Sequence, residues 1–313
     1  MSDSPFRERI GSLRAGVLFG IAVAVLALVS CGGNQTPSEL SRRLAERFAP
    51  ILYLHSDDPY DPRPVDTMID HSVLARNSPG LGQQIVDFNP SSDLGHYGDR
   101  DLFLDLKVAR IYQDPALYSE RYGQIRDMYS PTVYARVESI GEHVLLLQYW
   151  FFYWFNDWTN RHEGDWEMIA LLFPDTSVPQ ILEREFSPTV AAYSQHGLGR
   201  KREWCLVKRK GTHPKVYVAK GSHANYFEPG THFQIWGADE TTEGQVRVPQ
   251  SLEIAADETV IKYELISISG MAWINFPGHW GERSEIPGFD SPRGPAFQGI
   301  KWDSPDQWVE ELP

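Results

Sequence analysis

The segment of this chain with the greatest potential for chemistry is Asn156–Glu167, which reads Asn-Asp-Trp-Thr-Asn-Arg-His-Glu-Gly-Asp-Trp-Glu. In an extended chain, positions 163, 165 and 167 point the same way, so three carboxylates would share one face. Two carboxylates about 6 Å apart repel by roughly 3 kcal/mol at an effective dielectric constant of 20. This repulsion predicts a compensating positive group, which could be Arg161, a bound proton or a metal ion.

The residue types of this segment favour a divalent cation over a salt-linked loop in which Arg161 pairs with Glu163 or Glu167. The predicted metal ligands are Asp157, His162, Asp165 and Glu167. A ligand set made mostly of oxygen atoms favours Ca²⁺ or Mg²⁺, and added histidines would favour Mn²⁺ or Zn²⁺. Further candidate site residues are one acidic residue and three histidines at strand ends: Glu163, His196, His213 and His223.

The first thirty residues have the features of a lipoprotein signal peptide. Three arginines precede an uncharged stretch from Ala15 to Val29, which is shorter than the roughly 20 residues of a helix that spans a membrane. Leu28-Val29-Ser30-Cys31 resembles the lipobox of bacterial lipoproteins, in which the chain is cut before a cysteine that is then lipidated. The resemblance implies lipidation of Cys31, a flexible tether over residues 31–37 and export to the cell envelope, at the outer membrane if the bacterium has two membranes. The alternative is an ordinary signal anchor with an incidental cysteine.

Charge and cysteine content narrow the choice of partners. The formal net charge is −13, and an acidic body repels phosphate backbones, which argues against a nucleic-acid partner. Basic residues at 200–202 and 208–210 form a local exception that could meet anionic headgroups near the anchoring membrane. The only other cysteine is Cys205, which lies in an apolar, strand-like run, so we expect a buried structural thiol there.

Strands are the elements that must position these residues. Val144 to Phe155 is apolar at every position but Gln148, which is typical of a strand buried on both faces. Strands are predicted over residues 51–55, 102–111, 166–173, 189–194, 204–208, 215–219, 232–236 and 260–268, with two more inside 133–155. Helices are predicted over 38–48 and 115–128, and irregular chain over 77–100 and 277–313. The pattern predicts a mainly β, sandwich-like single domain over residues 38–313, with short peripheral helices and long loops.

Several segments together resemble the vacuolar protein sorting-associated family of the sixty-two type. They are residues 48–55, 148–153, 162–167, 213–219 and 221–224, with His279-Trp280-Gly281 and Gly294-Pro295 towards the end. The resemblance covers nearly all of residues 46–302, and His-Glu-Gly-Asp-Trp-Glu from position 162 is its most specific part. It implies no settled biochemical activity.

A more distant resemblance is to the necrosis- and ethylene-inducing-peptide-like proteins, whose hallmark is Gly-His-Arg-His-Asp-Trp-Glu. Residues 161–167 keep the His, Asp, Trp and Glu of that heptapeptide. The resemblance implies a β-sandwich that holds a divalent cation through His162, Asp165 and Glu167 with Asp157 upstream, and damage to plant membranes after binding of sphingolipid headgroups. Three motif residues differ, the loop after Asp157 is shorter and a lipidation signal is present, which argues against cytolysis more than against the metal.

The sequence leaves several functions open. The first is a binding module in which the cation helps to engage a lipid headgroup, a glycan or another envelope component. The second is a metal-dependent hydrolase, in which the ion activates a water molecule and Glu163 or a histidine moves protons. The third is a structural envelope protein with a salt-linked loop, and the resemblance adds a cytolysin-like membrane-active protein.

Overall fold

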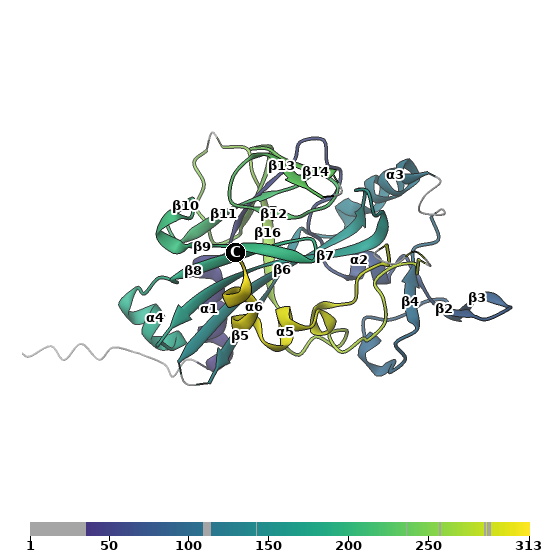
Figure 1. Cartoon of the computed structure of the whole chain (residues 1–313), viewed down its shortest axis with the longest axis horizontal. Coiled ribbons are helices and arrows are strands. Elements are labelled where there is room, and N and C mark those ends of the chain that lie inside the picture. The colour runs from purple at the N-terminus through teal and green to yellow at the C-terminus, as the bar shows by residue number, and fades with distance from the viewer. Residues whose placement is uncertain are drawn as a thin grey trace, which may run out of the picture. The chain divides into compact units, whose positions relative to one another are not determined.

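The computed structural model describes residues 36–108, 114–141, 143–235, 237–256, 258–284, 286 and 289–313. Thr36–Pro313 form one compact unit of mainly β structure (Figure 1). The predicted signal peptide, Cys31 and most of the predicted tether lie outside the described residues. Within the described part of the chain, no helix is long and apolar enough to cross a membrane.

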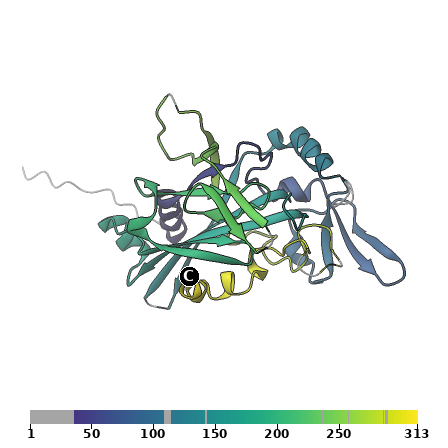
Figure 2. The same ribbon diagram turned by 45° about the horizontal axis from the view of Figure 1, so that its top comes forward.

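One mixed sheet of eleven strands forms the body of this unit. Its order is β10-β11-β1-β15-β16-β5-β6-β7-β8-β9, and β12 pairs with β11. The strands are β1 (Ile51–Leu54), β5 (Thr132–Ile140), β6 (Val144–Asn156), β7 (His162–Pro174), β8 (Val190–Gln195), β9 (Leu198–Glu203), β10 (Arg209–Lys210), β11 (His213–Val218), β12 (Asn225–Tyr226), β15 (Gln245–Pro249) and β16 (Ile261–Ser267). The prediction of mainly β structure is confirmed, but the two-layer sandwich is corrected to one curled mixed sheet (Figure 2).

Two smaller sheets are attached to this body. The first has the order β3-β2-β4 and contains β2 (Val73–Ser78), β3 (Gly82–Asp87) and β4 (Leu102–Asp105). The second is the hairpin of β13 (Gly230–Gln234) and β14 (Gly237–Thr241). Irregular chain was the expectation for residues 77–100, and β3 corrects it. No residue of β3 is fully buried, so this strand lacks the apolar alternation that identifies a strand in a sequence.

The helices are short and peripheral, as the sequence predicts. They are α1 (Pro37–Phe48), α2 (Asp66–Ile69), α3 (Pro115–Ile125), α4 (Val178–Arg184), α5 (Ile300–Asp303) and α6 (Pro305–Glu311). Two of them, α1 and α3, confirm predicted helices, and the Thr36 side chain caps α1. Irregular chain was predicted for 277–313, which is wrong where α5 and α6 form. Both helices are too short for their period to show in the sequence.

The longest strands carry the centre of the core. β6 is buried from Leu145 to Asn156, which confirms a strand covered on both faces. One face packs against α1, where the Tyr149 hydroxyl donates to the Ala45 carbonyl at 2.7 Å. The opposite face meets the C-terminal helices, where Gln148 donates to the Lys301 carbonyl at 2.8 Å. The one polar side chain in the apolar run therefore has a partner, as a buried amide requires.

Cys205 differs from its prediction. Trp204–Leu206 form a single 3₁₀ turn rather than a strand, and Cys205 is exposed. The Trp204 amide donates to the Thr189 carbonyl at 2.8 Å, which anchors the turn with Trp204 buried. The apolar run at 204–207 therefore contains two buried residues, Trp204 and Val207, on either side of two exposed ones, and is not a continuous buried strand.

Candidate functional site

Gly164 determines how the acidic residues of Asn156–Glu167 are arranged. β6 and β7 keep one register from the pair Asn156–His162 to the far end of the strands. Gly164 has φ +58°, a left-handed conformation that glycine adopts without a steric penalty. A Cβ atom at this position would collide with the carbonyl oxygen of Trp280. The left-handed residue interrupts the alternation of the strand, so the side chains before and after it meet different neighbours.

Glu163 lies apart from the other two carboxylates. Its Oε2 accepts from the backbone amides of Leu106 at 3.2 Å and Glu282 at 3.1 Å, and its Oε1 accepts from the Tyr118 hydroxyl at 2.9 Å. Burial, helped by the charge of Asp105, raises the pKa of Glu163 to about 8 against the effect of these hydrogen bonds. The prediction of three carboxylates on one face is therefore wrong for Glu163.

Asp165 belongs to a buried group that we call the Asp165 cluster, made of Asp58, Tyr153, Asp165, Glu167 and His223. His223 donates from Nδ1 to Asp165 Oδ2 at 2.9 Å, and its Nε2 lies 3.7 Å from Asp58 Oδ2. The Tyr153 ring stacks on the His223 ring with centroids 3.9 Å apart and an angle of 3°. Burial alone would lower the pKa of His223, but Asp165 and Asp58 raise it above the usual range. The two carboxylates thus favour the charged form of the His223 ring between them.

Glu167 completes the cluster from the same side as Asp165. Both carboxylates raise the pKa values of Tyr153 and His223, which places them near the same groups. Glu167 accepts a hydrogen bond from the Ser194 hydroxyl, and burial raises its pKa although Lys301 opposes this. The predicted common face is therefore correct for Asp165 and Glu167.

The other two predicted ligands are engaged locally. Asp157 forms an ion pair with Arg161 at 2.7 Å, so the arginine compensates neither Glu163 nor Glu167 as the salt-linked alternative expected. His162 donates from Nδ1 to the Gly164 carbonyl at 2.7 Å, which leaves the lone pair on Nε2. Among the described residues, no three His, Cys, Asp or Glu side chains lie close enough together to hold a metal ion. The donor types suit a cation, but the described positions of these side chains do not converge on one point.

The three additional histidines separate into different regions. His223 joins the Asp165 cluster, whereas His213 hydrogen-bonds the Ala49 carbonyl at 2.8 Å and fastens the end of α1. His196 lies in the turn between β8 and β9 with φ +57°. Its Nε2 donates to Asp239 Oδ2 at 2.7 Å. His223 is thus the histidine that bonds to a carboxylate of the predicted metal segment, whereas His196 packs on Trp158 of that segment and marks a second site.

Asp239 is the centre of that second site. It is fully buried and accepts from the Ser222 hydroxyl at 2.7 Å, the Tyr226 hydroxyl at 2.6 Å and His196. Burial acts to raise the pKa of Asp239, but hydrogen bonds from His196 and Tyr226 lower it below the usual range. Sequence reasoning missed Asp239 because it lies in an ordinary polar strand, and only the fold brings its donors together.

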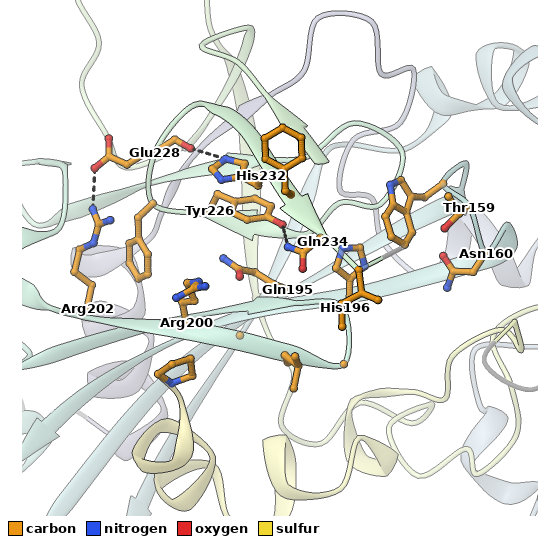
Figure 3. A pocket seen from close by; sticks show the side chains of 18 of the residues that line it. Thr159, Asn160, Gln195, His196, Arg200, Arg202, Tyr226, Glu228, His232 and Gln234 are labelled. Carbon is orange, nitrogen blue, oxygen red and sulfur yellow. Dashed lines mark hydrogen bonds and ion pairs between the residues drawn. The ribbon is translucent and has the colours of Figure 1, made fainter. Parts of the chain in front are cut away.

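A cavity of about 1080 Å³ opens beside His196, between the β8–β9 turn and the β13–β14 hairpin (Figure 3). The Trp158 ring lies 4.5 Å from the His196 ring at one end. On another wall, the His232 ring stacks on Tyr226 at 3.7 Å, and Gln234 donates to the Tyr226 hydroxyl at 2.8 Å. The cavity therefore combines aromatic faces with polar groups whose positions are fixed by hydrogen bonds.

Three apolar side chains at the rim of this cavity are strongly exposed. They are Leu198 at 74%, Phe233 at 86% and Ile235 at 90%. The nearby basic residues are mostly paired, since Arg202 and Lys208 both form ion pairs with Glu228 and Lys210 pairs with Glu258. The predicted basic patch is therefore partly neutralised by acidic neighbours.

Comparison with known proteins gives one sequence relative and several structural ones. No family model matches the chain. It is 26% identical over 192 residues to vacuolar protein sorting-associated protein 62 of Saccharomyces cerevisiae. The match covers 49% of this chain and spans 41% of that protein. The resemblance to the sixty-two type is thus confirmed as a weak similarity over half of the chain.

Structural comparison finds weak similarities to necrosis- and ethylene-inducing proteins. Necrosis and Ethylene inducing Protein 2 from the causal agent of cocoa's Witches Broom disease has a TM-score of 0.40 and 14% identity, with 85% of this chain and 89% of that chain covered. NLPPya in complex with glucosamine has a TM-score of 0.36 and 13% identity, with 76% and 77% covered. The non-toxic HaNLP3 protein has a TM-score of 0.37 and 14% identity, with 76% and 79% covered. These weak similarities assign no activity to this chain.

Proposed function

We propose that this protein is a binding module that takes a polar headgroup or glycan of an envelope or membrane component into the cavity beside His196. The observation that carries the proposal is the cavity itself, with about 1080 Å³ of space, aromatic walls and a few oriented polar side chains. Ligand sites in proteins have this composition, in which apolar and aromatic faces supply contact and a few fixed polar groups supply orientation. Trp158, Tyr226 and His196 provide both kinds of contact.

The lipid anchor is part of this proposal. Lipidation of Cys31 would tether the domain to the envelope through the few residues before α1, and would keep the cavity near its ligand. Cys31→Ser should leave the precursor uncut by the lipoprotein peptidase. Normal processing and membrane retention of that variant would contradict the anchor.

A divalent cation near the Asp165 cluster is the second part. Three observations support it: the carboxylates of Asp165 and Glu167 are buried near one another, the lone pair of His162 lies on Nε2, and Tyr153 has a buried hydroxyl with no partner among the described residues. Asp157, His162, Asp165 and Glu167 would hold the ion, with Ca²⁺ or Mg²⁺ favoured by the oxygen atoms. The ion would neutralise buried negative charge and order the loop at 157–162. A hydrolase is less well supported, because a catalytic metal needs an open position that faces a cleft.

The binding proposal can be tested by titration of the full chain in a non-ionic detergent. The ligands are glucose, inositol, glucosamine, mannosamine, glucose 6-phosphate and inositol 1-phosphate. The heat of binding is measured for each. At least one ligand should saturate, and Trp158→Ala should abolish its binding because a wall of the cavity is lost. Phe88→Ala is the matched control, since it removes an exposed aromatic ring elsewhere. Failure of the whole panel to bind would end the proposal.

A further inference from the structure

The charged side chains that line the cavity are more basic than those of the protein as a whole. The chain carries a formal net charge of −13, whereas the charged side chains that line the cavity include Arg200 and Arg202 against Glu228 alone. Arg202 already pairs with Glu228 at 2.8 Å. The Arg200 side chain makes no hydrogen bond or ion pair with any residue that the structure describes. Its guanidinium is therefore a free cation on the wall of a cavity in an acidic protein.

His196 offers a second nitrogen to the same space, which donates when the ring is protonated. Its Nε2 is committed to Asp239, which fixes the ring and leaves Nδ1 as the other polar atom. Nδ1 has no hydrogen-bond partner within the described part of the chain, and the side chain is 25% exposed. Figure 3 shows His196 and Arg200 on the β8–β9 side of the cavity, with Gln195 between them. Both donors therefore come from one hairpin of the main sheet.

The acidic side chains nearby do not compete for an anion. Asp239 is fully buried, and its two oxygen atoms already accept from Ser222, Tyr226 and His196. Glu228 is held by two cations, Arg202 and Lys208. No carboxylate side chain among the described lining residues is thus left to repel a negative ligand.

We infer that the cavity contains an anion subsite, formed by Arg200 and His196, that binds the phosphate of a phosphate-bearing sugar or polyol headgroup. The inference rests on the proposed binding function and specifies its ligand class. Arginine suits this ligand because its planar guanidinium can donate two parallel hydrogen bonds to a phosphate. The aromatic walls formed by Trp158 and Tyr226 would then contact the sugar or polyol ring.

Such a headgroup can come from a lipid or from a free sugar phosphate, and the rim of the cavity bears on this choice. Leu198, Phe233 and Ile235 extend into solvent next to the proposed subsite. Exposed apolar side chains beside basic residues are suited to the surface of an anionic bilayer. The chemistry of the phosphate is the same in both sources, so the two need separate experimental arms.

The first arm compares glucose with glucose 6-phosphate and inositol with inositol 1-phosphate, by calorimetric titration of the full chain in a non-ionic detergent at pH 7. We expect the phosphate to tighten binding by about tenfold or more, as a charge-assisted contact does. Arg200→Gln should remove this gain, so that this variant binds a neutral ligand and its phosphate with equal affinity. Arg121→Gln, on the exposed face of α3, is the matched control and should keep the gain. His196→Gln keeps a donor for Asp239 but removes the second nitrogen, so part of the gain should disappear.

Each outcome of this arm is decisive. Equal affinities for a neutral ligand and its phosphate would overturn the anion subsite and leave the proposed binding function intact. Retention of the gain in Arg200→Gln would also overturn it. Binding of neither ligand form would contradict both proposals together.

The second arm identifies the source of the headgroup. Vesicles of phosphatidylcholine with and without phosphatidylinositol are sedimented with the full chain, and Phe233→Ser/Ile235→Ser is compared with the unmodified protein. Weaker vesicle binding with unchanged affinity for inositol 1-phosphate assigns the headgroup to a lipid. Vesicle binding that is the same with and without phosphatidylinositol assigns it to a soluble sugar phosphate.

Discussion

The molecule contains two histidine–aspartate pairs that are locally alike and globally different. His223 donates to Asp165 and His196 donates to Asp239, at 2.9 and 2.7 Å. Both histidines lie in turns that follow strands and both have positive φ. His223 is sealed beneath Tyr153, whereas His196 borders an open cavity next to Trp158. The same pair of residue types thus serves as a buried cross-link in one place and as an oriented ligand contact in the other.

The difference lies in what surrounds the second nitrogen of each ring. His223 Nε2 faces Asp58, so two carboxylates compensate one buried imidazolium. His196 Nδ1 has no protein partner among the described residues and is free for a ligand. Burial therefore separates the two roles more clearly than the hydrogen bond to aspartate does, and the following experiments test this separation.

The largest effect is expected from His223→Ala. This change leaves Asp165 and Asp58 buried without their cation, so it should lower the free energy of unfolding by about 3–5 kcal/mol. His196→Ala should cost clearly less, because water can reach its site. Urea denaturation of the two variants measures the difference, and equal losses would show that the pairs do not differ as described.

Glu163 is a buried carboxyl group with no histidine among its hydrogen-bond partners in the described residues. Its contribution to the free energy of unfolding should depend on pH. Its pKa is raised by burial to about 8 in the folded chain, above the ordinary value of 4.5. A carboxyl group whose pKa is higher in the folded chain than in the unfolded chain stabilises the fold at pH values below its unfolded pKa. This contribution is lost as the pH rises towards its folded pKa. Stability should therefore fall by roughly 3 kcal/mol between pH 5 and pH 8. Glu163→Gln should flatten this dependence, measured in urea with a chelator present, and a variant as pH-sensitive as the wild type would refute it.

A bound cation would stabilise the fold through Asp165 and not through Asp239, which distinguishes the two histidine–aspartate pairs by their response to metal. A hundredfold excess of metal over its dissociation constant should stabilise the fold by about 2.7 kcal/mol, because only the folded chain forms the site. Asp165→Ala should abolish the metal-dependent shift in melting temperature, and Asp239→Asn should retain it. Calorimetry with chelator, Ca²⁺, Mg²⁺, Mn²⁺ and Zn²⁺ provides the comparison. A wild-type melting temperature that ignores all four ions would exclude the site.

The smallest effect concerns the charge on His196. Its burial acts to lower its pKa, but Asp239, Glu167 and Asp165 outweigh this and raise it above 6.5. The Lys301 ammonium group also lies near His196, where it donates to the backbone carbonyl of that residue. Affinity for inositol 1-phosphate should therefore fall, by about tenfold or less, as pH rises from 7 to 9 and the imidazolium is lost. Titration of His196→Gln should show no such decline, and a pH-independent wild type would contradict the role of His196.

The sequence predicted the elements around the site better than the contacts within it. β6, β7 and the two longer helices were foreseen because their apolar patterns are long. The common face of Asp165 and Glu167 was foreseen from strand geometry, but Glu163 was misplaced because one left-handed glycine at 164 redirects it. That conformation depends on the approach of Trp280, which no local pattern reveals.

The remaining partners depend on long-range topology. Asp58 reaches His223 only because β1 pairs with β11, and Asp239 reaches His196 only because the β13–β14 hairpin returns to the end of β8. These residues lie in ordinary turn and strand contexts, so their types carry no local signal. The sandwich prediction failed for a related reason, since strand spacing does not reveal that the strands join one continuous sheet.

The strand order of the main sheet also has a consequence for the time at which the protein can fold. β1 lies between β11 and β15, and β5 lies between β6 and β16. These two early strands therefore pair with strands that are synthesised much later. Pairing over such separations carries a large loop-closure entropy and makes folding slow. A growing chain cannot complete this sheet before Ile261–Ser267 have been synthesised. We therefore expect the nascent protein to remain open, with its apolar strands unpaired, for most of its synthesis.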